Sequence, residues 1–142
     1  MRILHFIWPL VVLTCVSGTV LAQSGASYTA RRRIDTIIVD GNLNEASWRG
    51  AALTTPFTFW DGTPVPPFLG TTAKMVWDDT YLYVAFAAID GNVYATYTSR
   101  DARLWEQDNY EVFVTIPGTT GYVEVEGSPI GTICLSSSTS RR

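Results

Sequence analysis

The sequence is poor in histidine, the residue on which many catalytic and metal sites depend. Its one histidine, His5, lies in an N-terminal stretch in which Arg2 precedes an apolar run and small residues end at Ala22, a pattern typical of an export signal. We expect residues 1–22 to be removed as a signal peptide, which leaves a mature chain without imidazole. Ser-His and Cys-His catalysis and histidine-bound zinc are then excluded, and metals bound by oxygen, such as calcium, remain.

The same stretch bears on location. A membrane anchor is the competing interpretation, but the run Ile3–Val16 is shorter than the roughly 20 residues that a spanning helix needs. We therefore expect a protein that is secreted, or held in the periplasm or at the cell surface, with no membrane contact after cleavage.

Cysteine is also scarce. Of the two cysteines, Cys15 belongs to the expected signal and Cys134 lies near the C-terminus. The mature chain can then form no internal disulfide. Its stability must come from a packed hydrophobic core, and the chain is long enough to build one such core.

Basic residues are also few. The chain has 10 Lys and Arg against 13 Asp and Glu, a formal net charge of -3, and losing Arg2 changes it to -4. This excess of acid argues against nucleic acid as a partner, because binding to a phosphate backbone needs clustered lysine and arginine. The one basic run, Arg31 to Arg33, closes a polar segment over residues 23–33 that we interpret as a solvated leader.

Aromatic and β-branched residues, in contrast, are plentiful and occur in short runs. One helical turn is predicted, with Asn44 as its cap and Trp48 turned inward, and no long helical period follows. The pattern predicts an edge strand and a long loop over 54–70, and strands over 34–39, 73–77, 81–87, 110–116 and 122–126. It indicates an all-β domain, an antiparallel β-sandwich of the immunoglobulin or jelly-roll kind.

Three segments carry a more specific pattern. They are Val39–Trp48, where an Asp-Gly turn precedes a Trp; Ala73–Phe86, built around Trp-Asp-Asp-Thr-Tyr-Leu-Tyr-Val; and Leu104–Phe113, which contains Trp-Glu-Gln-Asp. Together and in this order they resemble the family 9 carbohydrate-binding modules of secreted xylanases and related proteins. The resemblance implies a non-catalytic domain that binds oligo- or polysaccharide and that accompanies a glycoside hydrolase domain in a full-length relative.

The resemblance also implies site residues. Trp105 stands among polar residues, unlike a core Trp, and would stack on the apolar face of a pyranose, while Glu111 would accept hydrogen bonds from sugar hydroxyls. The polar neighbours Arg100, Gln107 and Asp108 are further candidates for sugar binding. Two alternatives stay open, namely that Trp105 folds back as a hydrophobic lid and that Glu111 is an ordinary solvent-facing residue of a strand.

No cofactor is required by this interpretation. Structural calcium occurs in the family, and Asp90 is the candidate ligand here, although a single carboxylate is a small part of the six to eight oxygens that calcium takes.

The C-terminal part departs from the family pattern. Family 9 modules continue with further strands and a second stacking Trp, which this sequence lacks, and residues 134–142 are rich in serine. That composition predicts a disordered tail. We therefore expect a domain over residues 34–133 that is incomplete at its C-terminus.

The sequence raises two other functions, catalysis and structural assembly. Glu124 and Glu126 are two residues apart on a predicted strand, which separates their backbones by roughly 6.5 to 7 Å, near the range of inverting glycosidases. Both fit a solvated strand face and nothing marks either as a proton donor, so we expect no enzyme activity. The alternative to sugar binding is a structural β-sandwich that joins partners in a secreted or surface assembly, and it predicts no response to saccharides.

Overall fold

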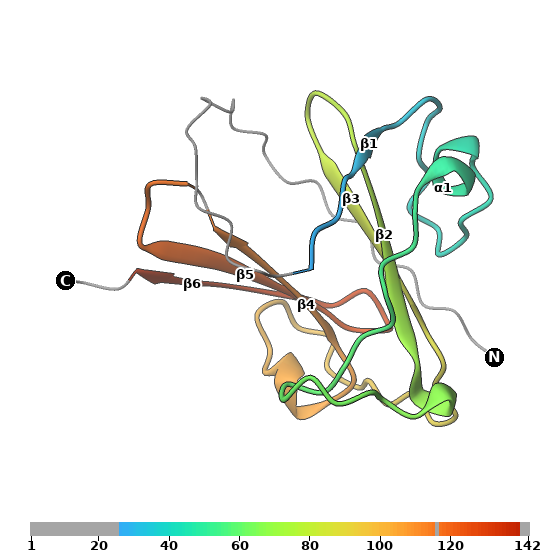
Figure 1. Ribbon diagram of the computed structural model, residues 1–142. Helices are drawn as coiled ribbons and strands as arrows, with labels where there is room; N and C mark the ends of the chain where they lie inside the picture. Colours follow the sequence, from blue (N-terminus) through green and yellow to red (C-terminus); the bar gives the residue numbers. More distant parts are fainter. Residues whose placement is uncertain (1–25, 116, 140–142) are drawn as a thin grey trace. The chain divides into compact units, whose positions relative to one another are not determined.

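The computed structural model describes residues 26–115 and 117–139 (Figure 1). The predicted signal peptide, residues 1–22, lies outside the described residues. The chain divides into two compact units, residues 1–90 and 91–142, which we call the N-terminal unit and the C-terminal unit and describe separately. No helix within the described ranges is long and apolar enough to cross a membrane.

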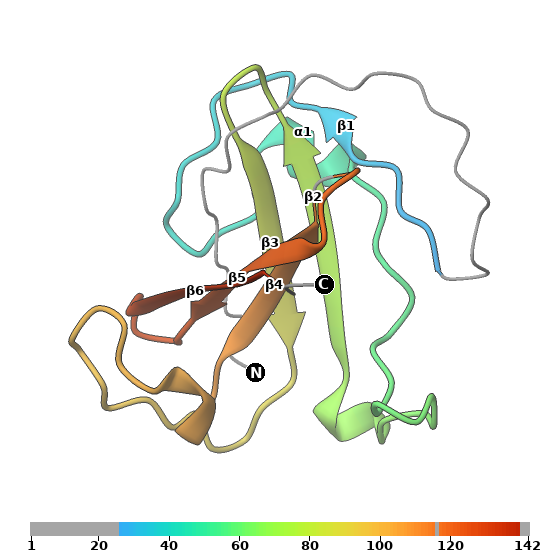
Figure 2. The same ribbon diagram turned by 90° about the vertical axis from the view of Figure 1, so that its left-hand side faces the viewer.

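The N-terminal unit is built on a three-stranded sheet with the order β1-β2-β3. Its elements are β1 (Arg31–Arg32), the helix α1 (Ala46–Gly50), the 3-10 helix η1 (Pro67–Leu69), β2 (Thr71–Trp77) and β3 (Leu82–Ala88). β1 runs parallel to β2, and β2 and β3 form an antiparallel hairpin (Figure 2). Met75 of β2 lies opposite Val84 of β3. The hairpin predicted from the alternating aromatic and β-branched residues is therefore confirmed.

The core of this unit lies where α1 packs against the hairpin. Trp48 is fully buried and packs with Val76, Ala85, Ile37 and Ala51. The inward direction predicted for Trp48 is therefore confirmed. Its ring supplies much of the apolar area that a sheet with only three strands can cover.

Two predictions for the start of the domain are wrong. Residues 34–39 form no strand, and the short strand β1 lies within the expected leader. Residues 34 and 35 bond to the helix α1 and not to a neighbouring strand. The Asp35 carboxylate accepts hydrogen bonds from the amides of Ala46, at 2.7 Å, and Ser47, at 3.1 Å. The Ser47 hydroxyl in turn accepts one from the amide of Ile34. Backbone groups that a strand would pair with another strand are used here to dock α1.

The helix cap differs for the same reason. Glu45, not Asn44, precedes the first helical residue, and its side chain makes no capping bond. The cap comes instead from Asp35, which lies outside the residues just before the helix where a cap is normally expected. The hydrogen bonds from Ser47 and from the two amides also lower the pKa of Asp35.

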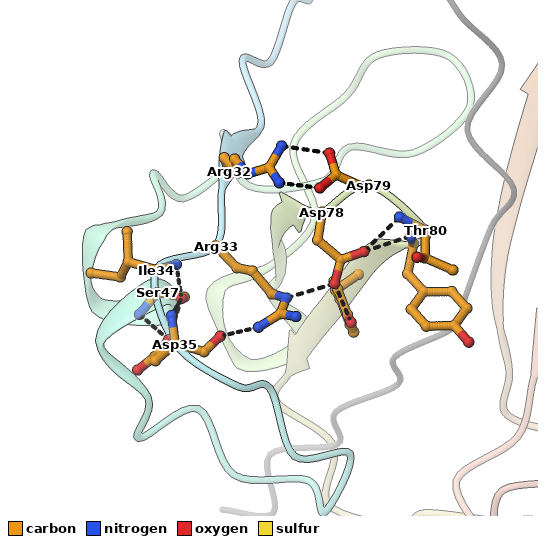
Figure 3. Close-up of polar contacts among 10 residues, drawn as sticks. Arg32, Arg33, Ile34, Asp35, Ser47, Asp78, Asp79 and Thr80 are labelled. Carbon is orange, nitrogen blue, oxygen red and sulfur yellow. Dashed lines mark hydrogen bonds and ion pairs between the residues drawn. The ribbon is translucent and has the colours of Figure 1, made fainter.

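The arginines of the expected leader are not simply solvated (Figure 3). Arg33 donates through Nε to Asp78 at 2.6 Å, and Arg32 forms a two-bond pair with Asp79, one of its bonds being 2.7 Å long. Asp78 also accepts hydrogen bonds from the amides of Thr80 and Tyr81, each at 2.8 Å. The turn between β2 and β3 therefore holds the segment that contains β1.

The C-terminal unit is a second sheet of three strands, all antiparallel and in the order β4-β5-β6. Its elements are the 3-10 helix η2 (Leu104–Glu106), β4 (Tyr110–Thr115), β5 (Gly121–Gly127) and β6 (Ile133–Thr139). With two three-stranded sheets and one five-residue helix, the described chain is all-β as predicted. Two sheets are also what an antiparallel sandwich is built from.

The strand β6 corrects the prediction of a disordered tail. Cys134 to Ser138 pair with Glu126 to Tyr122 of β5, and Cys134 is buried. The turn before β6 contains Gly131, whose φ of 85° suits glycine, and returns the chain alongside β5. Composition missed this strand because the hydrogen bonds of a ladder come from the backbone, so serines can occupy a strand that a neighbouring strand defines.

Candidate functional site

Trp105 is presented to solvent by a short helix. Within η2 the side chain of Leu104 is buried, whereas that of the next residue, Trp105, is 58% exposed. The Glu106 carboxylate pairs with Arg103 at 2.9 Å and accepts a hydrogen bond from the Tyr97 hydroxyl at 2.7 Å. The expected exposure of Trp105 is confirmed. Its role in sugar binding stays a prediction.

Gln107 and Asp108 hold the preceding loop in place. Gln107 Oε1 accepts hydrogen bonds from the amides of Thr96, at 2.6 Å, and Tyr97, at 3.2 Å, and its Nε2 donates to Thr96 Oγ1 at 2.7 Å. Asp108 Oδ2 accepts from the amide of Tyr94 at 2.6 Å. Both predicted sugar-binding residues are therefore engaged with residues 94–97 of the loop before η2.

Arg100 lies at the other end of this loop. It pairs with its neighbour Asp101 at 3.5 Å, and both side chains are more than half exposed. Asp101 has a φ of 59°, its amide donates to the carbonyl of Ile133 at 2.8 Å, and its Oδ1 accepts from the amide of Leu135 at 3.0 Å. The loop that carries Trp105 is thus tied to β6.

Glu111 lies on one face of the second sheet. Because directly opposed residues of a sheet share a face, the strand pairing places it with Phe113 on β4, Tyr122, Glu124 and Glu126 on β5, and Cys134 and Ser136 on β6. We call these seven residues the acidic face. Phe113 and Tyr122 pack edge to face on it, with 5.5 Å between ring centroids. An exposed carboxylate and aromatic rings therefore occur together.

Glu126 is the residue of this face whose surroundings differ from the prediction. It was expected on a solvated strand face with an ordinary acidity, but it is only 3% exposed, and burial raises its pKa while the amide of Asn109 opposes that rise. The burial of Glu126 depends on β6, which the sequence predicted as a disordered tail. Without β6, β5 would be an edge strand, whereas with β6 beside it Glu126 lies between Glu111 and Cys134.

Asn109 joins the two glutamates. Its Nδ2 donates to Glu126 Oε2 at 3.0 Å and to Glu111 Oε1 at 3.3 Å. The structure therefore brings Glu111 together with Asn109 and Glu126, and no hydrogen bond or ring contact joins Trp105 to this group within the described ranges. Asn109 was not singled out from the sequence, where only its place two residues before Glu111 could have suggested it.

Asp90, the candidate calcium ligand, is partly buried just after β3. Among residues 26–115 and 117–139, no group of three or more His, Cys, Asp and Glu side chains could hold a metal ion. Calcium can also be bound by carbonyl oxygens and water, so a site at Asp90 stays a prediction.

A second exposed tryptophan lies in the N-terminal unit. Trp60 is 99% exposed, and its turn is fixed by Asp61 Oδ1, which accepts from the Thr63 amide at 2.9 Å and the Thr63 hydroxyl at 2.7 Å. These bonds lower the pKa of Asp61. The sequence left the role of Trp60 open, and its position offers an exposed aromatic ring outside the predicted site.

Comparison with known proteins supports the predicted family. Residues 39–123 match the family model described as carbohydrate family 9 binding domain-like. The matched range includes the three segments on which the resemblance was based. No curated protein matches the chain, and no solved structure matches it. Glu126 and β6 lie beyond the matched range.

Proposed function

Because the chain belongs to the carbohydrate family 9 binding domain-like family, we propose that it is a non-catalytic module that binds oligo- or polysaccharide through its C-terminal unit. The observation that carries the proposal is the exposure of Trp105 on a helix whose neighbouring residue, Leu104, is buried. A pyranose presents an apolar face of C–H groups, and a flat ring held ready in solvent covers that face at little cost in side-chain entropy.

The polar part of the proposed site is Glu111. Its side chain is exposed, and one of its oxygens, Oε1, already accepts a hydrogen bond from Asn109. The other oxygen is available to a sugar hydroxyl, and a hydrogen bond to a charged acceptor contributes about 1.5 to 3 kcal/mol. Gln107 and Asp108 act in this proposal mainly by holding the loop before η2, and the exposed Arg100 is a further donor to sugar hydroxyls.

The carboxylates support binding better than catalysis. A glycosidase needs a proton donor that reaches the glycosidic oxygen. Glu126 is the glutamate of the acidic face whose pKa is raised, but it is almost fully buried and its Oε2 is engaged by Asn109. Its proton is therefore poorly placed for transfer to a bound sugar.

The test is a fluorescence titration with soluble neutral di- and tetrasaccharides. Sugar should quench tryptophan emission of the wild-type protein, and Trp105→Ala should abolish the response while the far-UV circular dichroism stays unchanged. Trp60→Ala is the matched control, since it removes a more exposed tryptophan from the other unit. Full binding by Trp105→Ala would refute the site, and loss of binding in Trp60→Ala would move it to the N-terminal unit.

One observation favours a second candidate function, contact with a protein partner. Five large apolar residues are exposed within one stretch of the N-terminal unit: Phe57, Phe59, Trp60, Phe68 and Leu69. Such residues are enriched at protein interfaces. This function predicts that the protein shows no response to saccharides, and that Trp60→Ala weakens self-association or partner binding measured by light scattering.

Location and calcium complete the proposal. Secretion, expected from residues 1–22, would bring the module to extracellular polysaccharide, and sequencing the N-terminus of the exported protein tests it. Calcium at Asp90 predicts a rise in unfolding temperature on adding the ion that Asp90→Ala removes. An equal rise in both proteins would refute that site.

A further inference from the structure

The side chain of Asn109 connects an exposed carboxylate to a buried one. An asparagine amide has two N–H donors, and here one is directed to the exposed Glu111 and the other to the buried Glu126. Glu111 and Glu126 are also directly opposed on β4 and β5. The position of the Glu111 carboxylate therefore depends on a residue that a ligand does not reach.

The surroundings of Glu126 contain acids from three strands. Glu111 faces it from β4, Glu124 lies two residues away on its own strand, and Cys134 faces it from β6 as a weak hydrogen-bond donor. Burial raises the pKa of Cys134, and the charges of Glu126 and of Asp101, which lies in the loop before η2, raise it further. Burial and the two neighbouring glutamates make the charged form of Glu126 costly, while Asn109 and Cys134 partly offset that cost.

We infer that Glu126, acting through Asn109, is a positioning residue for the Glu111 carboxylate, and that its charge controls how tightly the site holds sugar. This inference rests on the proposed function. A charged Glu126 draws the Asn109 amide toward itself and places a second negative charge opposite Glu111. A neutral Glu126 leaves the amide to Glu111 and removes the repulsion.

The sign of the pH effect follows from screening. A sugar bound on Glu111 displaces the water that screens the two carboxylates from each other, so their repulsion is stronger in the complex than in the free protein. The complex therefore favours the protonated form of Glu126, and binding takes up a proton in the range where Glu126 titrates. By linkage, affinity falls as the pH rises through that range. Each unit by which bound sugar raises the pKa of Glu126 corresponds to a tenfold change in affinity. We expect the affinity to fall about three- to tenfold as Glu126 becomes charged.

The experiment measures dissociation constants by calorimetry from about pH 4.5 to 8, in buffers of different ionisation enthalpy, with the saccharide that quenches Trp105. Glu126→Gln keeps the shape and an acceptor oxygen for Asn109, so it should bind tightly across the range and take up no proton. The matched control is Glu124→Gln, which removes a carboxylate from the same strand face, where it bonds to Ser136. It should keep a pH dependence of the same sign, moved toward lower pH because Glu124 also raises the pKa of Glu126, whereas Glu126→Gln should lose the dependence altogether.

Asn109→Ala should bind more weakly at every pH, because Glu111 loses its positioning hydrogen bond. Adding Glu126→Gln to it should still remove the pH slope, because the repulsion between the two opposed carboxylates does not pass through Asn109. Should Glu126→Gln fail to fold, the Glu126 carboxyl of the wild-type protein can be titrated by NMR, and its midpoint should rise when sugar is added. A wild-type slope in Glu126→Gln, or an NMR midpoint that sugar leaves unchanged, overturns the inference. No binding by wild-type protein at any pH refutes the proposed function instead.

Discussion

Replacing Asp78 by asparagine removes one charge from the turn between β2 and β3 while keeping its shape. The Asp78 side chain is 12% exposed and accepts four hydrogen bonds: Oδ1 takes the amides of Thr80 and Tyr81, and Oδ2 takes Arg33 Nε and the Tyr83 hydroxyl. In Asp78→Asn the carbonyl oxygen keeps the two amides. The new NH2 group then faces the N–H of Arg33, so two donors meet.

The expected cost follows from these contacts. The charge-assisted bond from Arg33 contributes about 1.5 to 3 kcal/mol, and the neutral bond from Tyr83 about 0.5 to 1.5 kcal/mol. Because the Tyr83 hydroxyl can rotate and accept from the new amide, its bond is kept, and we expect Asp78→Asn to lower the free energy of unfolding by about 1.5 to 3 kcal/mol. Asp79→Asn is the control, since the Arg32–Asp79 pair is exposed (52% and 77%) and such pairs contribute about 0 to 1 kcal/mol.

The assay is urea unfolding followed by tryptophan fluorescence, with Trp48 and Trp77 as reporters in the N-terminal unit. The pH dependence adds a second reading. Arg33, followed by the Thr80 amide, lowers the pKa of Asp78, so its contribution is present above the unfolded value of about 3.9 and is lost as the pH falls toward the folded value. Wild-type stability should therefore fall below about pH 4 by more than that of Asp78→Asn. A loss in Asp78→Asn no larger than in Asp79→Asn would refute the reasoning.

Two further changes test the C-terminal unit. The pKa of Glu126 is raised mainly by burial. Its contribution to stability is therefore present below the pKa of the unfolded chain and is lost as the pH rises through the pKa of the folded protein. Glu126→Gln should raise the urea midpoint at neutral pH, and an unchanged midpoint would contradict this. Asp101→Ala removes the acceptor of the Leu135 amide and should lower the free energy of unfolding by about 0.5 to 1.5 kcal/mol. Faster hydrogen exchange at the Leu135 amide would confirm that Asp101 holds β6, and unchanged exchange would argue against it.

Local patterns predicted much of the fold. The hairpin of β2 and β3 follows from two runs of β-branched and aromatic residues around an Asp-Asp turn, and α1 follows from a single inward Trp48. In the hairpin, the interactions that decide the structure lie between residues close in sequence, whereas the direction of Trp48 followed from its apolar character alone. The strands β4 and β5 follow from alternation in the same way: Val112 and Val114 alternate with Glu111, Phe113 and Thr115, and Val123 and Val125 alternate with glutamates.

What the sequence could not show depends on contacts between distant residues. Asp35 caps α1 from outside the helix, and Arg32 and Arg33 are held by the turn between β2 and β3. The burial of Glu126 depends on β6, a strand whose serines indicated a disordered tail. In the candidate site, the exposure of Trp105 was predictable from its polar neighbours, whereas the connection from Glu126 through Asn109 to Glu111 required the register of three strands.

The pairing of β6 with β5 gives the molecule a chemical reporter. Cys134 is the free cysteine of the described residues, its thiol is buried on β6, and burial raises its pKa, so both access and thiolate formation slow its reaction with a disulfide reagent. The rate of labelling then counts how often the last strand detaches from the sheet. If saccharide is held by Trp105 and Glu111, whose supports include Asp101 and β6, bound ligand should slow that rate, and occupancy of the site could be followed without a chromophore in the sugar.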